Sequence, residues 1–169
     1  MITTQNIILI GMPGCGKTTA GRSLSQAMRR PFSDIDELIE AAAGKGIPEI
    51  FADDGEEVFR SIETRILSEE TGKSGIVIAT GGGVVTRTEN LELLRRNGLV
   101  VYLERELSEL VIDGRPLSES VGVQVLAKKR LPLYISWSDY TVQVEPSPER
   151  TAARILEAIG RGHSREKAI

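Results

Sequence analysis

The residues best placed for chemistry form the segment 11–18, GMPGCGKT, which follows the apolar run 7–10. The spacing G-x-x-x-x-G-K-T is typical of a phosphate-binding loop, because glycines tolerate positive φ and let successive backbone N–H groups surround a polyphosphate. Lys17 is expected to reach the β and γ oxygens of a nucleotide. Thr18 is expected to offer its hydroxyl to Mg²⁺, at the start of a helix whose positive end faces the phosphates. A glycine-rich turn can also bind nothing, but the strand before it and the helical spacing after it favour nucleotide binding.

Two further groups of residues come directly after predicted strands. Asp34 and Asp36 follow a short strand at 31–34 and, two apart in an extended chain, are expected to point to the same side. The run Gly81–Gly83 follows a strand at 75–79, where bare backbone would let a ligand approach closely. In open α/β sheets, ligands bind beyond the carboxyl ends of the strands. These two groups and the phosphate loop are therefore expected to open onto one cleft.

The two aspartates have a structural and a catalytic interpretation. Either one can simply cap the helix that follows. A phosphoryl transferase, however, needs one carboxylate to orient the accepting hydroxyl and another to hold water on Mg²⁺. We assign Asp36 to the hydroxyl and Asp34 to the outer shell of the metal.

Other charged residues carry little signal by themselves. Arg60 and Glu63 lie at i and i+3 on one predicted helix, a spacing that is usually a surface ion pair worth ~0.3–0.5 kcal/mol. Arg115 and Arg130 are, in isolation, typical solvated charges. His163, the only histidine, lies in a polar end segment, where a solvated side chain is expected.

Apolar strand-like runs alternate with helical stretches along the chain, which predicts an α/β fold with helices on both faces of a parallel sheet. Five strands are predicted, at 6–10, 31–34, 75–79, 99–103 and 140–144. Predicted helices follow at 18–28, 36–43, 47–52, 55–71, 123–133 and from 147 onward. Another begins after Thr88 and is closed by Gly98. The polar segment 108–122 has the composition of a short lid, and the tail 161–169 is expected to be frayed.

Length and composition narrow the function classes. A chain of 169 residues predicts one domain, and 27% charged with 40% hydrophobic residues is ordinary for a soluble protein. A net charge of -3 gives no broad positive field, so nucleic acid is not an expected partner. Apolar runs are strand-sized and no leader segment is recognisable, so we expect a cytoplasmic protein without membrane association. The single cysteine, Cys15, excludes an internal disulfide and is expected to be a small filler of the loop.

Several segments of the sequence together resemble those of the shikimate kinase family, a family of small P-loop kinases. The matching segments are GMPGCGKTT at 11–19, DID at 34–36, IPEIFADDGEEVFRSIE at 47–63, TGGG at 80–83, GRPL at 114–117 and RLPLY at 130–134. The phosphate loop is shared with many NTPases, whereas the later segments in this order are much more specific. The resemblance extends to about residue 159 and implies a single-domain P-loop kinase fold with a central five-stranded parallel sheet.

The resemblance also implies roles for individual residues. Shikimate would be contacted by Asp36, Arg60, Gly82 and Arg130, with the two arginines on its carboxylate and Asp36 and the Gly82 backbone on its ring hydroxyls. ATP would be bound by Gly14, Cys15, Gly16, Lys17, Thr18, Thr19 and the lid arginine Arg115, with Mg²⁺ on Thr18. The implied reaction transfers the γ-phosphoryl of ATP to the 3-hydroxyl of shikimate in aromatic amino-acid biosynthesis, with Asp36, Lys17 and Arg115 as catalytic residues. Oligomeric state has no sequence signal, and a monomer is the expectation.

One departure and two alternatives stay open. Many relatives have a longer, more basic lid with an additional arginine before the R-P-L segment, whereas here 110–114, LVIDG, leads directly into Arg115. A P-loop kinase for another small acceptor, such as gluconate, is the nearest alternative. A nucleotide-dependent switch is the alternative from another class, although no guanine-reading N-K-x-D motif is present.

Overall fold

The computed structural model describes residues 3–110 and 122–166. Five strands form one parallel sheet in the order β2-β3-β1-β4-β5. Their bounds are β1 Asn6–Ile10, β2 Phe32–Asp34, β3 Val77–Ala79, β4 Gly98–Glu104 and β5 Tyr140–Gln143. The predicted five-stranded parallel sheet is thus confirmed, and most predicted strands are longer than the observed ones by one or two residues.

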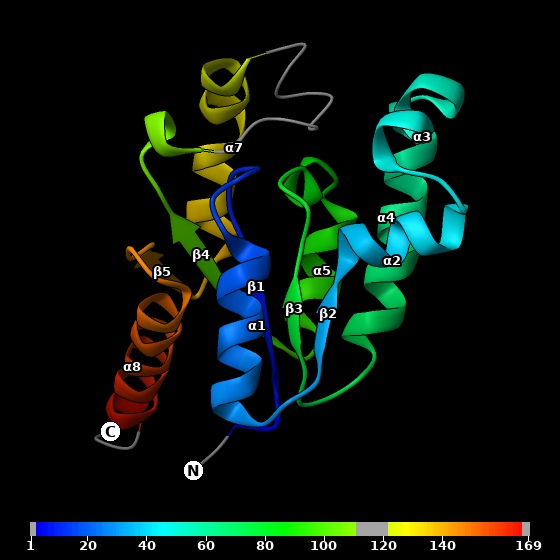
Figure 1. Cartoon of the computed structure of the whole chain (residues 1–169). Helices are drawn as coiled ribbons and strands as arrows, with labels where there is room; N and C mark the ends of the chain where they lie inside the picture. The colour runs from blue at the N-terminus through cyan, green and yellow to red at the C-terminus, as the bar shows by residue number, and fades with distance from the viewer. Residues whose placement is uncertain (1–2, 111–121, 167–169) are drawn as a thin grey trace.

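Helices cover both faces of this sheet (Figure 1). They are α1 Lys17–Met28, α2 Ile35–Ala43, α3 Ile47–Asp54, α4 Glu56–Thr71, α5 Glu89–Arg95, α7 Val123–Trp137 and α8 Pro148–Glu166. Two short 3-10 turns, η1 Val84–Thr86 and η2 Leu107–Glu109, follow β3 and β4. Within the described ranges, no helix is both long and apolar enough to cross a bilayer.

The core lies in two layers because successive side chains of a strand point to opposite faces. Ile8 and Ile10 of β1 pack in a cluster with residues of α2, α3, α4, α5 and α7. Ile7 and Leu9 pack in the opposite cluster, which α1 and α8 cover. All five residues of β1 are buried, which is why this strand appears in the sequence as a continuous apolar run rather than an alternating one.

Parallel pairing brings the carboxyl ends of the strands to one edge of the sheet. Leu9 lies opposite Ala79 of β3 and Val101 of β4, and Asp34 of β2 lies opposite Ala79. The loops after β1, β3 and β4 and the start of α2 therefore leave the sheet side by side. This edge is the upper one in Figure 1.

Three boundary predictions are wrong. Gly98 does not close α5 but begins β4, and Thr88 makes no side-chain cap. The helix α7, predicted to end at Leu133, continues to Trp137, because Arg130, Tyr134 and Trp137 keep one buried face along the helix. The helix α8 continues past Gly160 to Glu166, where a frayed tail was expected. Residues 167–169 and the central lid segment 111–121 lie outside the described residues.

Candidate functional site

A cavity of about 600 Å³ opens at the carboxyl edge of the sheet. Its lining includes the phosphate loop after β1, Asp36 of α2, Arg60 and Glu63 of α4, residues 80–83 after β3, and Arg130 of α7. The predicted cleft is therefore present, and residues separated by more than 100 positions in the sequence line it together. Arg115 lies outside the described residues, so its predicted place on the phosphates stays a prediction.

The phosphate loop has the backbone that its glycines predict. Gly14 and Gly16 have φ values of 78° and 101°, which are unfavourable for residues with a Cβ. Gly16 then caps the amino end of α1 without any side-chain cap, so the first N–H groups of that helix stay available for an anion. The Nζ of Lys17 lies 2.9 Å from the carbonyl oxygens of both Gly11 and Met12. These two contacts hold the ammonium at the cavity wall, within the loop that is expected to cradle the phosphates.

Two predicted nucleotide-binding residues of the loop differ in how they face the cavity. Thr19 lines it, and its hydroxyl donates to the carbonyl oxygen of Gly16 at 3.2 Å. Cys15 is fully buried in the core cluster beneath α1 and α8. Its thiol is thus the filler that the sequence predicted, and only its backbone can take part in binding.

The aspartate that ends β2 joins two elements. The Oδ1 of Asp34 accepts from the backbone N–H of Glu37 at 3.1 Å and so caps α2, while Oδ2 accepts from the Thr18 hydroxyl at 2.5 Å. The helix begins at Ile35, so the expectation that Asp34 and Asp36 extend to one side of a strand is wrong. They still reach the same cavity edge, because Asp36 lies in the first turn of α2.

Asp36 is half-buried and lines the cavity from the first turn of α2. Burial raises its pKa from 3.8 to about 6, and the carboxylates of Glu63 and Asp34 add to this, while Lys17 and Arg60 act in the opposite direction. A Cβ placed on Gly81 would lie only 2.9 Å from Asp36 Oδ1. The glycine thus leaves room for this carboxylate beside the backbone of the loop that follows β3.

Arg60 is buried, so it is not the solvated surface pair that its spacing alone would suggest. Its Nη1 donates to Glu63 Oε1 at 2.9 Å, and its Nε lies 3.4 Å from Glu56 Oε1. A Cβ on Gly83 would collide with its guanidinium, so the third glycine of the loop leaves space for this side chain. Arg60 is therefore held from two sides by elements that the i, i+3 spacing alone does not reveal.

Glu63 is fully buried below Arg60. Burial raises its pKa, and the charges of Arg60, Arg130 and Arg87 oppose that rise. Its Oε2 has no hydrogen-bond partner among the described residues. A buried carboxylate with a guanidinium on one oxygen fixes the direction of that guanidinium, and this is a positioning role rather than a contribution to stability.

Arg130 reaches the cavity from α7 and is also buried, which lowers its pKa. It shares a side-chain hydrogen bond with Tyr134, one turn further along the helix. The Tyr134 hydroxyl in turn donates to the carbonyl oxygen of Gly82 at 2.5 Å. This hydrogen bond ties α7 to the loop after β3 and places Arg130 on the same side of the cavity as Arg60.

A model of the shikimate kinase family matches residues 13–160 of the chain. The chain belongs to the shikimate kinase family. The shikimate kinase of Marinomonas sp. is 40% identical over 173 residues, with 95% of each chain covered. That of Synechococcus elongatus is 41% identical over 173 residues and covers 94% of this chain and 90% of the relative.

Solved structures of shikimate kinases have the same architecture. The enzyme of Acinetobacter baumannii, solved in complex with shikimate, superimposes with a TM-score of 0.90 at 37% identity, and the alignment covers 95% of both chains. A gluconokinase of Sinorhizobium meliloti has a TM-score of 0.55 at 15% identity, which shows a shared fold only. The predicted family and fold are confirmed.

Several residues that line or support the cavity were not identified from the sequence. Phe51 and Phe59 form a tilted aromatic pair with centroids 4.8 Å apart on the wall beside α3 and α4. Tyr134 was part of a matched segment but had no role. Arg105 comes directly after β4, so the same rule that selected the residues after the first three strands could have selected it.

Proposed function

We propose that this chain transfers the γ-phosphoryl group of ATP to the 3-hydroxyl of shikimate, giving shikimate 3-phosphate and ADP. The observation that carries the proposal is the cavity in which a phosphate loop, an aspartate of raised pKa and two buried arginines meet. A planar carboxylate on a ring with hydroxyls matches this set, because guanidinium groups bind carboxylates through paired hydrogen bonds. The A. baumannii relative solved with shikimate supports the same acceptor.

In this proposal shikimate binds at one end of the cavity and the nucleotide at the other. Arg60 and Arg130 hold the shikimate carboxylate, and the Gly82 backbone and Asp36 hold ring hydroxyls. Gly14–Thr19 hold the nucleotide, and Lys17 neutralises charge on the β and γ phosphates. Arg115 from the lid segment is proposed to add a second positive charge there.

Asp36 is proposed as the group that directs the 3-hydroxyl and accepts its proton. A general base works best when its pKa lies near the working pH, and burial brings that of Asp36 to about 6. Phosphoryl transfer has a loose transition state, so alignment of the hydroxyl and neutralisation of charge supply most of the acceleration. The buried Arg60–Glu63 pair supports this by holding the acceptor in one orientation.

Magnesium fits the residues at the phosphate end. Thr18 and Asp34 present a hydroxyl and a carboxylate oxygen in contact with each other, and Mg²⁺ is typically held by one or two protein oxygens together with phosphates and water. We propose Thr18 as the direct ligand and Asp34 as the holder of its water. When bound there, the ion neutralises negative charge on the transferring phosphates.

The setting of the reaction is also a proposal. We propose a cytoplasmic enzyme of the pathway toward chorismate and the aromatic amino acids, since shikimate is the acceptor that the site supports. We also propose that the enzyme is a monomer. A net charge of -3 supports small molecules, rather than nucleic acid or a membrane surface, as partners.

The deciding experiment measures ADP formation with shikimate as the varied acceptor and Mg-ATP in excess. Saturable ADP release that depends on shikimate, with shikimate 3-phosphate as product, is the expected result. Gluconate in the same assay tests the alternative small acceptor, and activity with gluconate but not shikimate would overturn the proposal. Phosphate release without any acceptor, together with tight nucleotide retention, would instead indicate a switch.

A further inference from the structure

Arg105 lies at the phosphate end of the cavity, and the reaction proposed above assigns it no role. It follows β4, the strand next to β1 on the side away from β3. Ile10 lies opposite Tyr102 in that pairing, so the residues after β4 leave the sheet beside the phosphate loop. The position of Arg105 is therefore fixed by the sheet itself rather than by the lid segment.

The guanidinium of Arg105 contacts the loop near its last glycine. Its Nη1 donates to the carbonyl oxygen of Cys15 at 3.5 Å, and a Cβ placed on Gly16 would lie 3.8 Å from the same nitrogen and 3.6 Å from Thr19 Oγ1. These residues belong to the part of the loop whose backbone N–H groups face the α and β phosphates in this motif. Arg105 thus lies beside the part of the loop where the phosphates that remain in ADP would bind.

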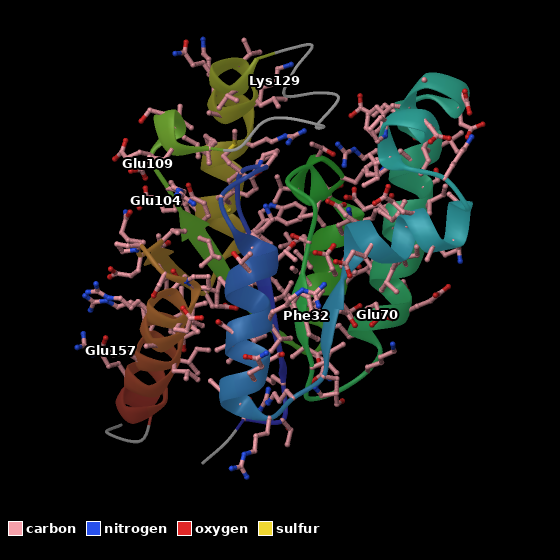
Figure 2. The ribbon with its side chains drawn as sticks, viewed as in Figure 1. Phe32, Glu70, Glu104, Glu109, Lys129 and Glu157 are labelled. Carbon is pink, nitrogen blue, oxygen red and sulfur yellow. The ribbon has the colours of Figure 1, made fainter. Side chains whose placement is uncertain are left out.

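The electrostatic partners of Arg105 distinguish it from the other cations of the cavity. Among the described residues, four cations line the cavity: Lys17, Arg60, Arg105 and Arg130. Lys17 and the other two arginines are buried, whereas Arg105 keeps 32% of its side chain exposed. Its ion-pair partner among the described residues is Glu109 of η2, whose carboxylate lies 3.6 Å from the Arg105 Nε and is itself 60% exposed. Figure 2 shows Glu109 beyond the end of β4, at the edge of the molecule.

We propose that Arg105 is a nucleotide-binding residue that contacts the α and β phosphates of ATP and ADP. A long hydrogen bond to a carbonyl and a loose pair with a solvated carboxylate are weak compared with a charge-assisted contact to a phosphate, so the side chain can exchange one for the other.

The inference rests on the proposed function for its nucleotide, but its test does not require shikimate. Calorimetry on the whole protein measures the dissociation constants of Mg-ADP and of inorganic pyrophosphate for wild type, R105A and R105K. Arg65→Ala is the matched control, because Arg65 is an exposed arginine of α4 paired with Glu69 and does not line the cavity. The expected result is a loss of about tenfold in affinity for both ligands in R105A, a partial recovery in R105K and no change in R65A.

Two further measurements separate phosphate binding from a structural role or contact with the base. Glu109→Gln removes the carboxylate that competes for Arg105, so ADP affinity should stay equal or rise. If Arg105 only anchored η2, this variant would instead lose affinity as R105A does, and the proposal would fail. Loss of ADP affinity without loss of pyrophosphate affinity would place Arg105 on the base and would also overturn it. If wild type binds ADP normally but shows no shikimate-dependent turnover, the proposed function fails while the assignment of Arg105 stands.

Discussion

The proposed catalytic role of Asp36 depends on a carboxylate that can accept a proton. Replacing it by Asn keeps the shape of the side chain but removes its ability to accept a proton. We expect turnover in D36N to fall by roughly 10²–10⁴-fold, the usual contribution of a general base, while the dissociation constant of Mg-ADP changes less than about twofold. Steady-state kinetics and ADP calorimetry on the same preparation test this. Near-normal turnover would remove Asp36 from the catalytic role.

The pKa of about 6 at Asp36 also predicts two opposite pH dependences. Only the carboxylate form accepts a proton, so kcat/KM for shikimate should fall about tenfold per pH unit below pH 6 and level off above it. The folded pKa exceeds the ordinary value of 3.8, so the ionised group destabilises the folded state above pH 6, and this effect disappears as the pH falls to 4 and below. At pH 7–8 we therefore expect D36N to unfold with a free energy about 2–3 kcal/mol higher than wild type. An acidic limb centred below pH 5, or a less stable D36N, would contradict this account.

Arg60 provides the sharpest test of the acceptor end. Removing its guanidinium should raise the KM for shikimate by about 10²-fold, the loss expected for a buried charge-assisted pair, with the KM for ATP within about twofold of wild type. Because R60A leaves the buried Glu63 without the guanidinium that donates to its Oε1, R60K is measured with it. Lysine keeps the charge but not the planar fork, so R60K should fold normally and recover only part of the affinity.

The control for R60A is R65A, because Arg65 is an exposed arginine on the same helix. R65A should leave the KM values for shikimate and for ATP unchanged. Equal losses for shikimate and ATP in R60A would contradict a carboxylate clamp.

At the scale of elements, the sequence predicted the sheet well because each strand is an apolar run bounded by polar or glycine residues. The prediction of β1 matches residue for residue. It failed where packing outweighs local signals. The helix α7 runs past its predicted end at Leu133 because its buried face continues to Trp137. A glycine in a helix costs only about 1 kcal/mol, which the packing of α8 on α1 and β5 outweighs.

The sequence alone selected those residues of the site that come directly after a strand. Asp36, Gly82 and the phosphate loop were found by this rule, and applying it to β4 would have added Arg105. Arg60 and Arg130 were selected by family resemblance alone, since nothing local distinguishes a buried arginine from a solvated one. Their burial depends on the glycine loop and on Tyr134, which become neighbours only in the folded chain.

Tyr134 is the link between α7 and the loop after β3, and Y134F tests that link. Loss of the hydroxyl leaves the Gly82 carbonyl without this donor and frees Arg130 from one partner. We expect about 1 kcal/mol lower free energy of unfolding and a several-fold higher KM for shikimate, with the KM for ATP unchanged. Urea unfolding and steady-state kinetics provide the two readouts. A loss of stability with an unchanged KM for shikimate would show that the hydrogen bond only supports the fold.

At the scale of the whole molecule, the cavity gathers ionisable side chains whose charged forms are disfavoured by burial. Burial raises the pKa of Asp36 and of Glu63 and lowers that of Arg130, so each charged form is less favourable here than in water. A site of this kind lowers the stability of the free protein, and a ligand of complementary charge restores it. The two arginines make the shikimate carboxylate the part of the acceptor that should matter most.

Thermal unfolding with shikimate and with its methyl ester tests this coupling, because the ester keeps the ring hydroxyls and removes the charge. Shikimate at about 100 times its dissociation constant should add ~2.7 kcal/mol to the free energy of unfolding, a rise in Tm of roughly 5–10 °C for a chain of this size. The ester at the same concentration should raise Tm by much less, and Mg-ADP should raise it in wild type and R60K alike. In R60K the shift caused by shikimate should shrink toward that caused by the ester, since the guanidinium fork is absent. Equal shifts by acid and ester in wild type would mean that the hydroxyls, and not the carboxylate, determine how this cavity holds its acceptor.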